Sequence, residues 1–137
     1  MVTFNYETEF EISNESILEN WVKTIISNNG YETGELNFVF CDDEYLHKLN
    51  VEFLNHDTFT DVISFDNTLG KLISGDIFIS VERVRENANE YNATFEDELH
   101  RVMIHGALHF LGFKDKSPED EKMMRYQEND ALLILNN

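Results

Sequence analysis

Two histidines and an aspartate in the C-terminal third of the chain have the spacing of metal ligands. His105 and His109 are four residues apart, and Asp115 follows after Gly112. On an α-helix, side chains four residues apart lie on the same face one turn apart, so two imidazoles can reach a common point. Gly112 permits a sharp turn because glycine accepts positive φ, and such a turn can bring Asp115 back toward the pair. The pattern therefore predicts a metal site at the C-terminal end of the histidine-bearing helix.

This ligand set favours zinc. Two imidazoles and a carboxylate with open positions suit Zn²⁺, which acidifies a bound water toward neutral pH. Ferrous iron and nickel accept similar ligands, so zinc is a preference among divalent metals. The competing interpretation is that both histidines are core residues bonded to backbone on an apolar helix. The glycine and aspartate at loop-return distance favour the metal site, as does the need of two inward-facing imidazoles for polar partners.

The spacing also resembles that of the metzincin proteases, whose signature is His-Glu-x-x-His-x-x-Gly-x-x-His. The residue after His105 is Gly106, so the glutamate that acts as general base in those enzymes is absent. A protease is therefore not expected.

Net charge limits the partners of the protein. The 137 residues include 27 acidic and 10 basic side chains, for a formal charge of -17. Such a surface repels phosphate backbones and anionic membranes, which excludes a protein that coats nucleic acid. The basic residues are concentrated late in the chain: residues 1–82 hold three basic and sixteen acidic side chains, and residues 83–137 hold seven and eleven. We therefore expect a small basic-rimmed groove around the metal helix.

Composition indicates a globular protein of the cytoplasm. Hydrophobic residues make up 42% of the chain and eleven are phenylalanine, which is typical of a chain with a packed core. The single cysteine, Cys41, lies in an apolar run and is expected to be buried, which fits a reducing compartment. The first residues lack the features of an export signal, and no apolar stretch is long enough to span a membrane.

Hydrophobic periodicity and capping residues divide the chain into alternating elements. Strands are predicted near 2–6 and 35–41, and two more at 60–65 and 72–80 are joined as a hairpin. Helices are predicted at 14–27, after Asp42, and at 80–91, 94–111 and 117–135, several of them with capping hydroxyls. This order predicts an α+β fold: a single domain over residues 1–137, with a small mixed β-sheet of about four strands and about five helices packed on it.

Three segments in the same order resemble the YbeY family of metal-dependent endoribonucleases and rRNA maturation factors. Thr60–Phe65 is similar to the family's Thr-Asp-Val-Leu-Ser-Phe-Pro, and Gly75–Ile79 contains its Gly-Asp-Ile. The third segment is similar to the family's His-Gly-x-Leu-His-x-x-Gly-Tyr-Asp-His; the matching residues are His105, Gly106, Leu108, His109 and Gly112, with Phe113 at the aromatic position.

The resemblance implies a hydrolase that cleaves single-stranded RNA. It implies roles in rRNA maturation, including the 3′ end of 16S rRNA, and in ribosome quality control, with one Zn²⁺ at the active site. The expected partners are rRNA and, beyond it, ribosomal particles or ribosomal proteins, with neither membrane nor DNA. The implied location is cytoplasmic.

The chain departs from the family pattern at three positions. Asp115 stands where the third metal histidine usually lies, and an aspartate there is a competent ligand. Leu54 occupies the position at which many members carry an arginine thought to assist catalysis. Asp66 replaces the usual proline.

Two further residues are candidates for a direct role in catalysis. Arg101 lies one helical turn before His105 and could replace the missing arginine at the scissile phosphate, as could Arg83 or Arg85. Ser64, on the strand beside the metal helix, is expected near the substrate groove or as support for a ligand, and the same is considered for Asp76.

Two other functions remain open from the sequence. One is metal-dependent hydrolysis of a substrate other than RNA, such as a peptide or small ester. The other is a non-catalytic ribosome assembly factor that keeps the metal as a structural element, although structural zinc usually has four protein ligands.

Overall fold

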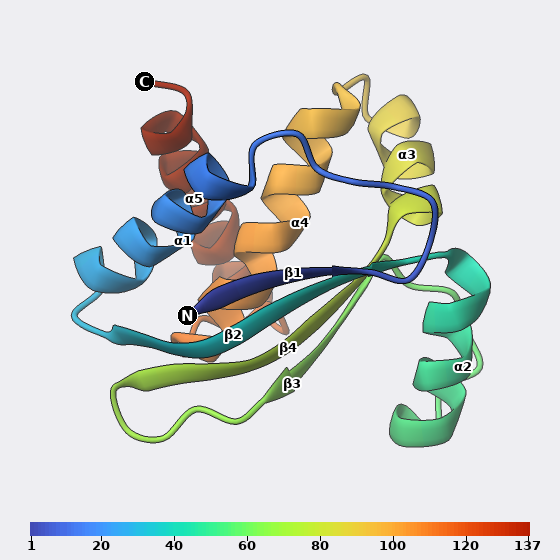
Figure 1. Ribbon diagram of the computed structural model, residues 1–137, viewed down its shortest axis with the longest axis horizontal. Coiled ribbons are helices and arrows are strands. Elements are labelled where there is room, and N and C mark those ends of the chain that lie inside the picture. The colour runs from blue at the N-terminus through green and yellow to red at the C-terminus, as the bar shows by residue number, and fades with distance from the viewer.

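The computed structural model describes all 137 residues and contains one four-stranded sheet (Figure 1). The strands are β1 (Val2–Tyr6), β2 (Glu32–Cys41), β3 (Val62–Asp66) and β4 (Leu72–Ser80), in the spatial order β1-β2-β4-β3. β1, β2 and β4 are parallel, and β3 pairs antiparallel with β4. The predicted mixed sheet and its hairpin are therefore confirmed.

Five helices cover the two faces of the sheet. α1 (Glu15–Asn28), α3 (Val81–Glu90), α4 (Phe95–Phe110) and α5 (Pro118–Leu135) lie on one side, and α2 (Asp43–Leu54) lies on the other (Figure 1). Side chains of the strands alternate accordingly: Ile77 and Ile79 enter the main core, whereas Phe78 packs on the smaller cluster around Leu46. The α+β prediction is thus confirmed, with four helices on the larger core.

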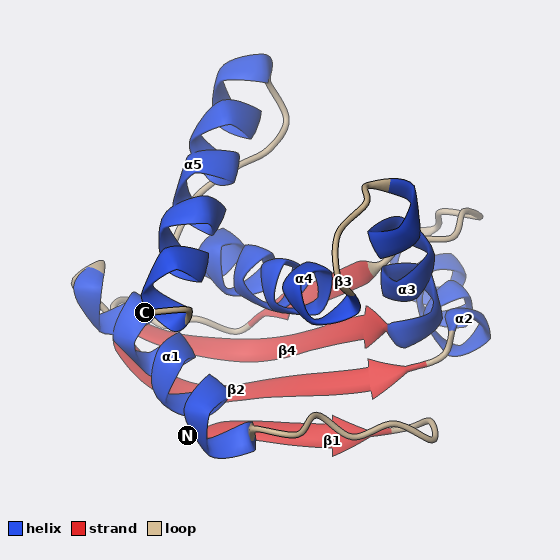
Figure 2. Cartoon of the chain, turned by 90° about the horizontal axis from the view of Figure 1, so that it is seen from above, coloured by secondary structure: helices blue, strands red, loops and turns tan.

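Helix α4 lies over the β4–β3 side of the sheet, and α1 lies over β1 and β2 (Figure 2). The approach of α4 to the sheet is close because of Gly106: a Cβ atom there would lie 2.9 Å from Cγ2 of Ile77. The glycine after His105 therefore sets the distance between the histidine-bearing helix and β4.

Capping residues begin the two helices that build the site. Thr94 Oγ1 accepts a hydrogen bond from the backbone N–H of Asp97 at 3.1 Å, which begins α4. Ser117 Oγ accepts from the N–H of Asp120 at 3.1 Å, and Pro118 is the first residue of α5. Both starts agree with the sequence, since a cap hydroxyl satisfies an amide that has no partner within the helix.

Two boundaries differ from the prediction. β2 begins at Glu32 rather than residue 35, because the N–H of Glu32 donates to Lys71 at 2.8 Å and the strand continues past an irregularity after Thr33. β3 begins at Val62 rather than Thr60. Cys41 is fully buried, as expected. None of the helices combines the length and apolar character needed to cross a bilayer.

Candidate metal centre

Helix α4 presents His105 and His109 from one face, one turn apart. Their ring centroids lie 4.6 Å apart, and the two Nε2 atoms are 3.0 Å apart. Both side chains are partly exposed, and their polar contacts are with carboxylates instead of backbone. Neither histidine therefore has the environment of a core residue.

Asp115 returns to the histidine pair through a turn at Gly112. α4 ends at Phe110, and Gly112 has a φ of 101°, a conformation that side chains disfavour. The N–H of Phe113 then donates to the carbonyl of Leu108 at 3.1 Å, which reverses the chain. As a result, Oδ2 of Asp115 lies 3.3 Å from Nε2 of each histidine.

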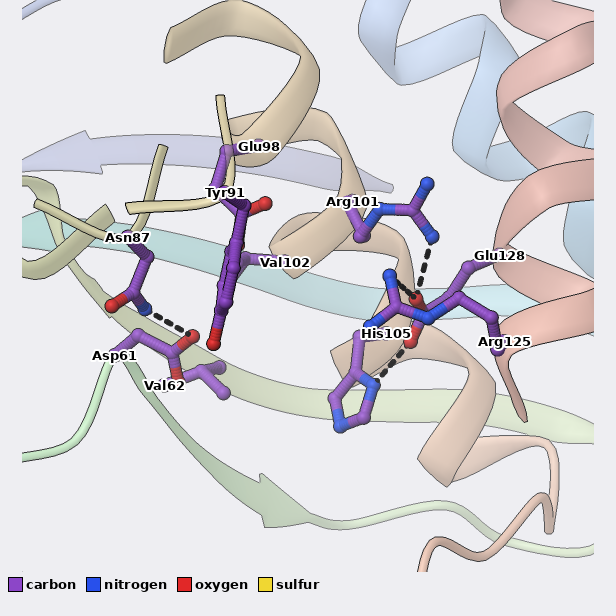
Figure 3. A pocket seen from close by; sticks show the side chains of 10 residues that line it. All are labelled: Asp61, Val62, Asn87, Tyr91, Glu98, Arg101, Val102, His105, Arg125 and Glu128. Carbon is purple, nitrogen blue, oxygen red and sulfur yellow. Dashed lines mark hydrogen bonds and ion pairs between the residues drawn. The ribbon is translucent and has the colours of Figure 1, made fainter. Parts of the chain in front are cut away.

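Glu128 of α5 fixes the orientation of His105. Its Oε2 lies 2.7 Å from Nδ1 of His105, and the side chain is only 5% exposed (Figure 3). Burial alone would raise the pKa of Glu128, but the hydrogen bonds from His105 and Arg101 outweigh it and hold that pKa below its usual value. An ionised carboxylate only accepts hydrogen bonds, so Nδ1 of His105 carries a proton, and Nε2 is the nitrogen available to a metal when the imidazole is neutral.

The three predicted ligands fit a divalent metal. One ligand atom each from His105, His109 and Asp115 can be chosen so that all lie within 4.8 Å of one another. Nε2 of His105 faces a second imidazole and a carboxylate, so three atoms that can bind a cation converge on one point. A cation satisfies such an arrangement, and two imidazoles with one carboxylate are a set that binds zinc and related metals. Glu128 supports this ligand set through its contact with His105, and it was not singled out from the sequence.

A signal for Glu128 was nevertheless present in the sequence. The buried residues of α5 are Met124, Glu128 and Ala131, which form one stripe at helical spacing. A glutamate in the middle of an apolar stripe needs a partner on the facing helix. The identity of that partner depends on how α5 packs against α4.

Arg101 lies one turn before His105, as predicted, but its guanidinium is already engaged. Nη1 donates to Oε1 of Glu128 at 2.9 Å, and Nη2 donates to Oδ1 of Asn129 at 2.9 Å. Arg125 adds a longer contact to the same carboxylate at 3.6 Å. Arg101 therefore neutralises the carboxylate that orients His105, while still lining the cavity beside that histidine. Arg83 pairs instead with Asp43, on the α2 side of the sheet.

Ser64 lies on β3 and faces the same groove as the three candidate ligands. The groove has a volume of about 740 Å³, and its walls include Leu54, Ser64, His105, His109 and Asp115. The leucine that replaces the family arginine thus lines the groove that holds the candidate metal site. Asp76 does not line this groove. Its carboxylate accepts a hydrogen bond from Asn37 within the sheet at 2.8 Å.

Charge around the site is mixed, which differs from the basic rim expected from the sequence. The basic side chains beside the site are Arg101, Lys116, Lys122 and Arg125. The acidic ones are Asp61, Asp66, Glu98, Asp115, Glu121 and Glu128. The uneven distribution along the chain did not predict this, because folding brings Asp61 and Asp66 of the acidic N-terminal part against the metal helix.

Comparison with known proteins identifies close relatives over nearly the whole chain. The family model described as endoribonuclease YbeY matches residues 3–136. A protein named endoribonuclease YbeY from Flavobacterium johnsoniae is 54% identical over 134 residues, which cover 98% of this chain and 96% of the relative. A protein of the same name from Porphyromonas gingivalis is 48% identical over 119 residues, which cover 87% and 79%.

A solved structure supports the same relationship. The solution structure of a Thermotoga maritima protein superimposes with a TM-score of 0.64 at 28% identity, and the match covers 96% of this chain and 89% of the other. With the fold, the ligand geometry and these relatives in agreement, the chain belongs to the YbeY family, as its motifs predicted.

Proposed function

We propose that the protein is a metal-dependent endoribonuclease that cleaves single-stranded RNA in rRNA maturation, with Zn²⁺ held by His105, His109 and Asp115. The proposal includes processing of the 3′ end of 16S rRNA and a part in ribosome quality control. The observation that carries it is the convergence of three ligand atoms in an open groove of about 740 Å³. A divalent metal bound there would lower the pKa of a water toward neutrality and polarise a phosphate oxygen.

The side chains around the candidate metal site then each have a definable task. Glu128 holds Nε2 of His105 toward the groove through its contact with Nδ1. Arg101 offsets the charge of Glu128, and its remaining N–H groups lie beside His105, where a phosphate oxygen would bind. Ser64 offers a hydroxyl donor to the substrate from β3, in the wall of the groove. Arg101 and Ser64 are thus our proposed substrate contacts.

Two exposed aromatic side chains lie close in sequence to the groove and suit unpaired RNA. Phe53 and Phe59 are more than half exposed, and they lie next in sequence to Leu54 and Thr60, which line the groove. Exposed rings of this kind stack on bases that are free of a duplex. The strongly negative protein would then bind RNA chiefly through the metal, the arginines and such stacking.

The competing functions are less well supported by the geometry. A peptide hydrolase with a glutamate after the first histidine would need a side chain at position 106, where an added Cβ atom would lie 2.9 Å from Cγ2 of Ile77. A purely structural metal usually has four protein ligands, and only three converge here. The absent arginine at Leu54 is the one observation that favours a non-catalytic assembly factor, which would act on ribosomal particles or ribosomal proteins.

The test compares metal content and RNA cleavage in the same preparations. The wild-type protein is purified without a histidine tag, its metals are measured, and cleavage of a single-stranded rRNA fragment is followed with the metal removed and restored. His105→Ala should lose both metal and cleavage. His47→Ala is the matched control, because His47 pairs with Asp57 away from the groove and should retain both. Cleavage by metal-free His105→Ala would refute the mechanism, and stoichiometric metal without cleavage would favour the assembly factor.

A further inference from the structure

A second cavity adjoins the metal groove, and most of the residues in its walls have no role in the mechanism above. It has a volume of about 230 Å³, and its walls include Asp61, Asn87, Tyr91, Glu98 and His105 (Figure 3). His105 and Asp61 also line the groove, so the two spaces meet at these residues. An RNA bound at the candidate metal site could therefore place an adjacent group in this cavity, which we name the Tyr91 cavity.

Glu98 faces the Tyr91 cavity without a partner. The residue is 7% exposed, and its carboxylate forms no hydrogen bond or ion pair within the protein. Burial, together with the nearby charge of Asp61, raises the pKa of Glu98 above its usual value. The carboxylate oxygens are open to the cavity and are not sealed in the core, so the cavity is suited to a ligand that donates hydrogen bonds.

Asp61 adds a second poorly satisfied carboxylate to the same wall. The only side-chain hydrogen bond it accepts comes from Nδ2 of Asn87 and is long, at 3.4 Å. Burial raises the pKa of Asp61, against the opposing effect of hydrogen bonds and of the charge of His105. Two carboxyl groups and an amide thus present hydrogen-bonding atoms to one small space.

The surrounding charges exclude the simplest ligands. A phosphate beside Tyr91 would face the carboxyl groups of Asp61 and Glu98, which repel it, so the phosphate contact proposed for Arg101 belongs to the His105 end of the cavity (Figure 3). A second metal ion would face Arg101 and Arg125, and the one group of potential metal ligands that comes together in the protein is the His105 cluster. An uncharged group with N–H donors meets neither objection.

Tyr91 supplies a surface for a flat ligand. The side chain is 65% exposed at the end of α3. In Figure 3 its ring is seen edge-on, between the Asn87–Asp61 pair on one side and the Arg101–Glu128–His105 group on the other. An aromatic face beside hydrogen-bonding atoms is the usual setting in which proteins bind an unpaired base.

We propose that the Tyr91 cavity is a nucleobase subsite that selects guanine, stacked on Tyr91 and bound through its N1–H and N2 amino groups to Glu98. This inference rests on the proposed RNA substrate and adds base selection to it. The Watson–Crick edge of guanine presents two adjacent donors to one carboxylate. Uracil presents a single N–H between two carbonyl oxygens, which would face the carboxylate and be repelled.

Nucleotide binding tests the subsite without any cleavage. GMP, IMP and UMP are titrated by calorimetry into zinc-loaded protein; their phosphates are the same, so differences report on the base. GMP should bind about tenfold tighter than UMP, the size expected for one bidentate base contact. IMP, which lacks the 2-amino group, should bind with intermediate affinity. Equal affinities for GMP and UMP, or no binding of either, would overturn the proposal.

Variants assign the effect to the named residues. Glu98→Gln should bring the ratio of GMP to UMP affinity close to one, and Tyr91→Ala should weaken all three nucleotides by a similar factor while Tyr91→Phe does not. Glu96→Gln is the matched control, since Glu96 is exposed on the first turn of α4 and outside this cavity. Tyr91 is exposed, so its variants test the cavity independently of any change in stability caused by Glu98→Gln. A full GMP preference in a folded Glu98→Gln protein contradicts the proposal.

A cleavage experiment separates this inference from the proposed function. The substrate is a single-stranded oligouridine with one guanosine at a chosen position. Cuts should occur at a constant distance from the guanosine and move with it, and in Glu98→Gln they should spread along the chain. Cleavage at positions that do not depend on the guanosine would contradict the guanine subsite but not the proposed endoribonuclease activity. If the protein cleaves no RNA but still prefers GMP to UMP, the endoribonuclease proposal is wrong and the guanine subsite is supported.

Discussion

Nδ1 of His105 lies 2.7 Å from Oε2 of Glu128, across the contact between α4 and α5. This contact joins the metal site to the packing of the last helix, because Glu128 is buried in the stripe that α5 presents to the rest of the protein. The geometry of one proposed ligand therefore depends on residues far from it in sequence.

Replacing Glu128 should weaken metal binding without removing a ligand. In Glu128→Gln the charge that fixes the His105 tautomer is lost, and the zinc affinity should fall by about 10- to 100-fold, the usual effect of removing a carboxylate behind a metal-binding histidine. Competition with a chromogenic chelator measures it. Glu119→Gln, at an exposed position in the first turn of α5, serves as the control. An unchanged zinc affinity in Glu128→Gln would show that the contact does not orient His105.

Gly106→Ala should destabilise the protein although it lies within a helix. Alanine at an unconstrained helical position is more favourable than glycine by about 1 kcal/mol. Here the new Cβ would lie 2.9 Å from Cγ2 of Ile77, so α4 must move away from β4. We expect a loss of about 1–3 kcal/mol in the free energy of unfolding, measured by urea denaturation of the metal-free protein. A gain in the free energy of unfolding would mean that the side chain of Ile77 can shift to accommodate the new Cβ without destabilising the protein.

Leu54→Arg should raise RNA cleavage. Leu54 is 42% exposed and lines the groove with the candidate ligands, so an arginine there can reach a bound phosphate without burying its charge. A charged hydrogen bond of this kind predicts roughly a tenfold increase in kcat/KM on single-stranded RNA. Leu54→Gln provides a polar side chain without the charge and should change the rate little. Equal rates for the arginine and glutamine variants would argue that other side chains, such as Arg101, already supply the charge.

The difference in stability between Glu98→Gln and the wild-type protein should depend on pH. Burial and the charge of Asp61 raise the pKa of Glu98, so its carboxyl group ionises less readily in the folded protein than in the unfolded chain. The associated stability is present below the pKa of the unfolded chain and is lost as the pH rises through the folded pKa. The glutamine variant escapes this loss and should be more stable than wild type by about 1 kcal/mol at pH 7, with the difference shrinking toward pH 4.

Thermal unfolding of both metal-free proteins at several pH values checks this prediction. A difference that is constant between pH 4 and pH 7 would indicate that Glu98 does not ionise at a cost in the folded state. Glu96→Gln should follow wild type throughout, because its side chain is exposed.

Much of the fold follows from local patterns in the sequence. The capping side chains of Thr94 and Ser117 and the helical periodicity of the segments they begin depend only on neighbouring residues, so α4 and α5 could be placed closely. The grouping of the three candidate ligands was also predictable, since His105 and His109 share a helical face and Asp115 follows a single turn. These are relationships within a short stretch of chain, and the YbeY motifs fall in the same stretches.

The tertiary structure decided what surrounds the ligands. Glu128 reaches His105 because α5 packs on α4, and Asp61 faces the same histidine because β3 lies at the edge of the sheet beside α4. Neither arrangement has a local signature, since each brings together residues more than twenty positions apart. For the same reason the groove is mixed in charge where the order of residues suggested a basic rim. The sequence determined the helices and the grouping of the candidate ligands, and long-range packing determined the orientation, charge and second cavity of the site.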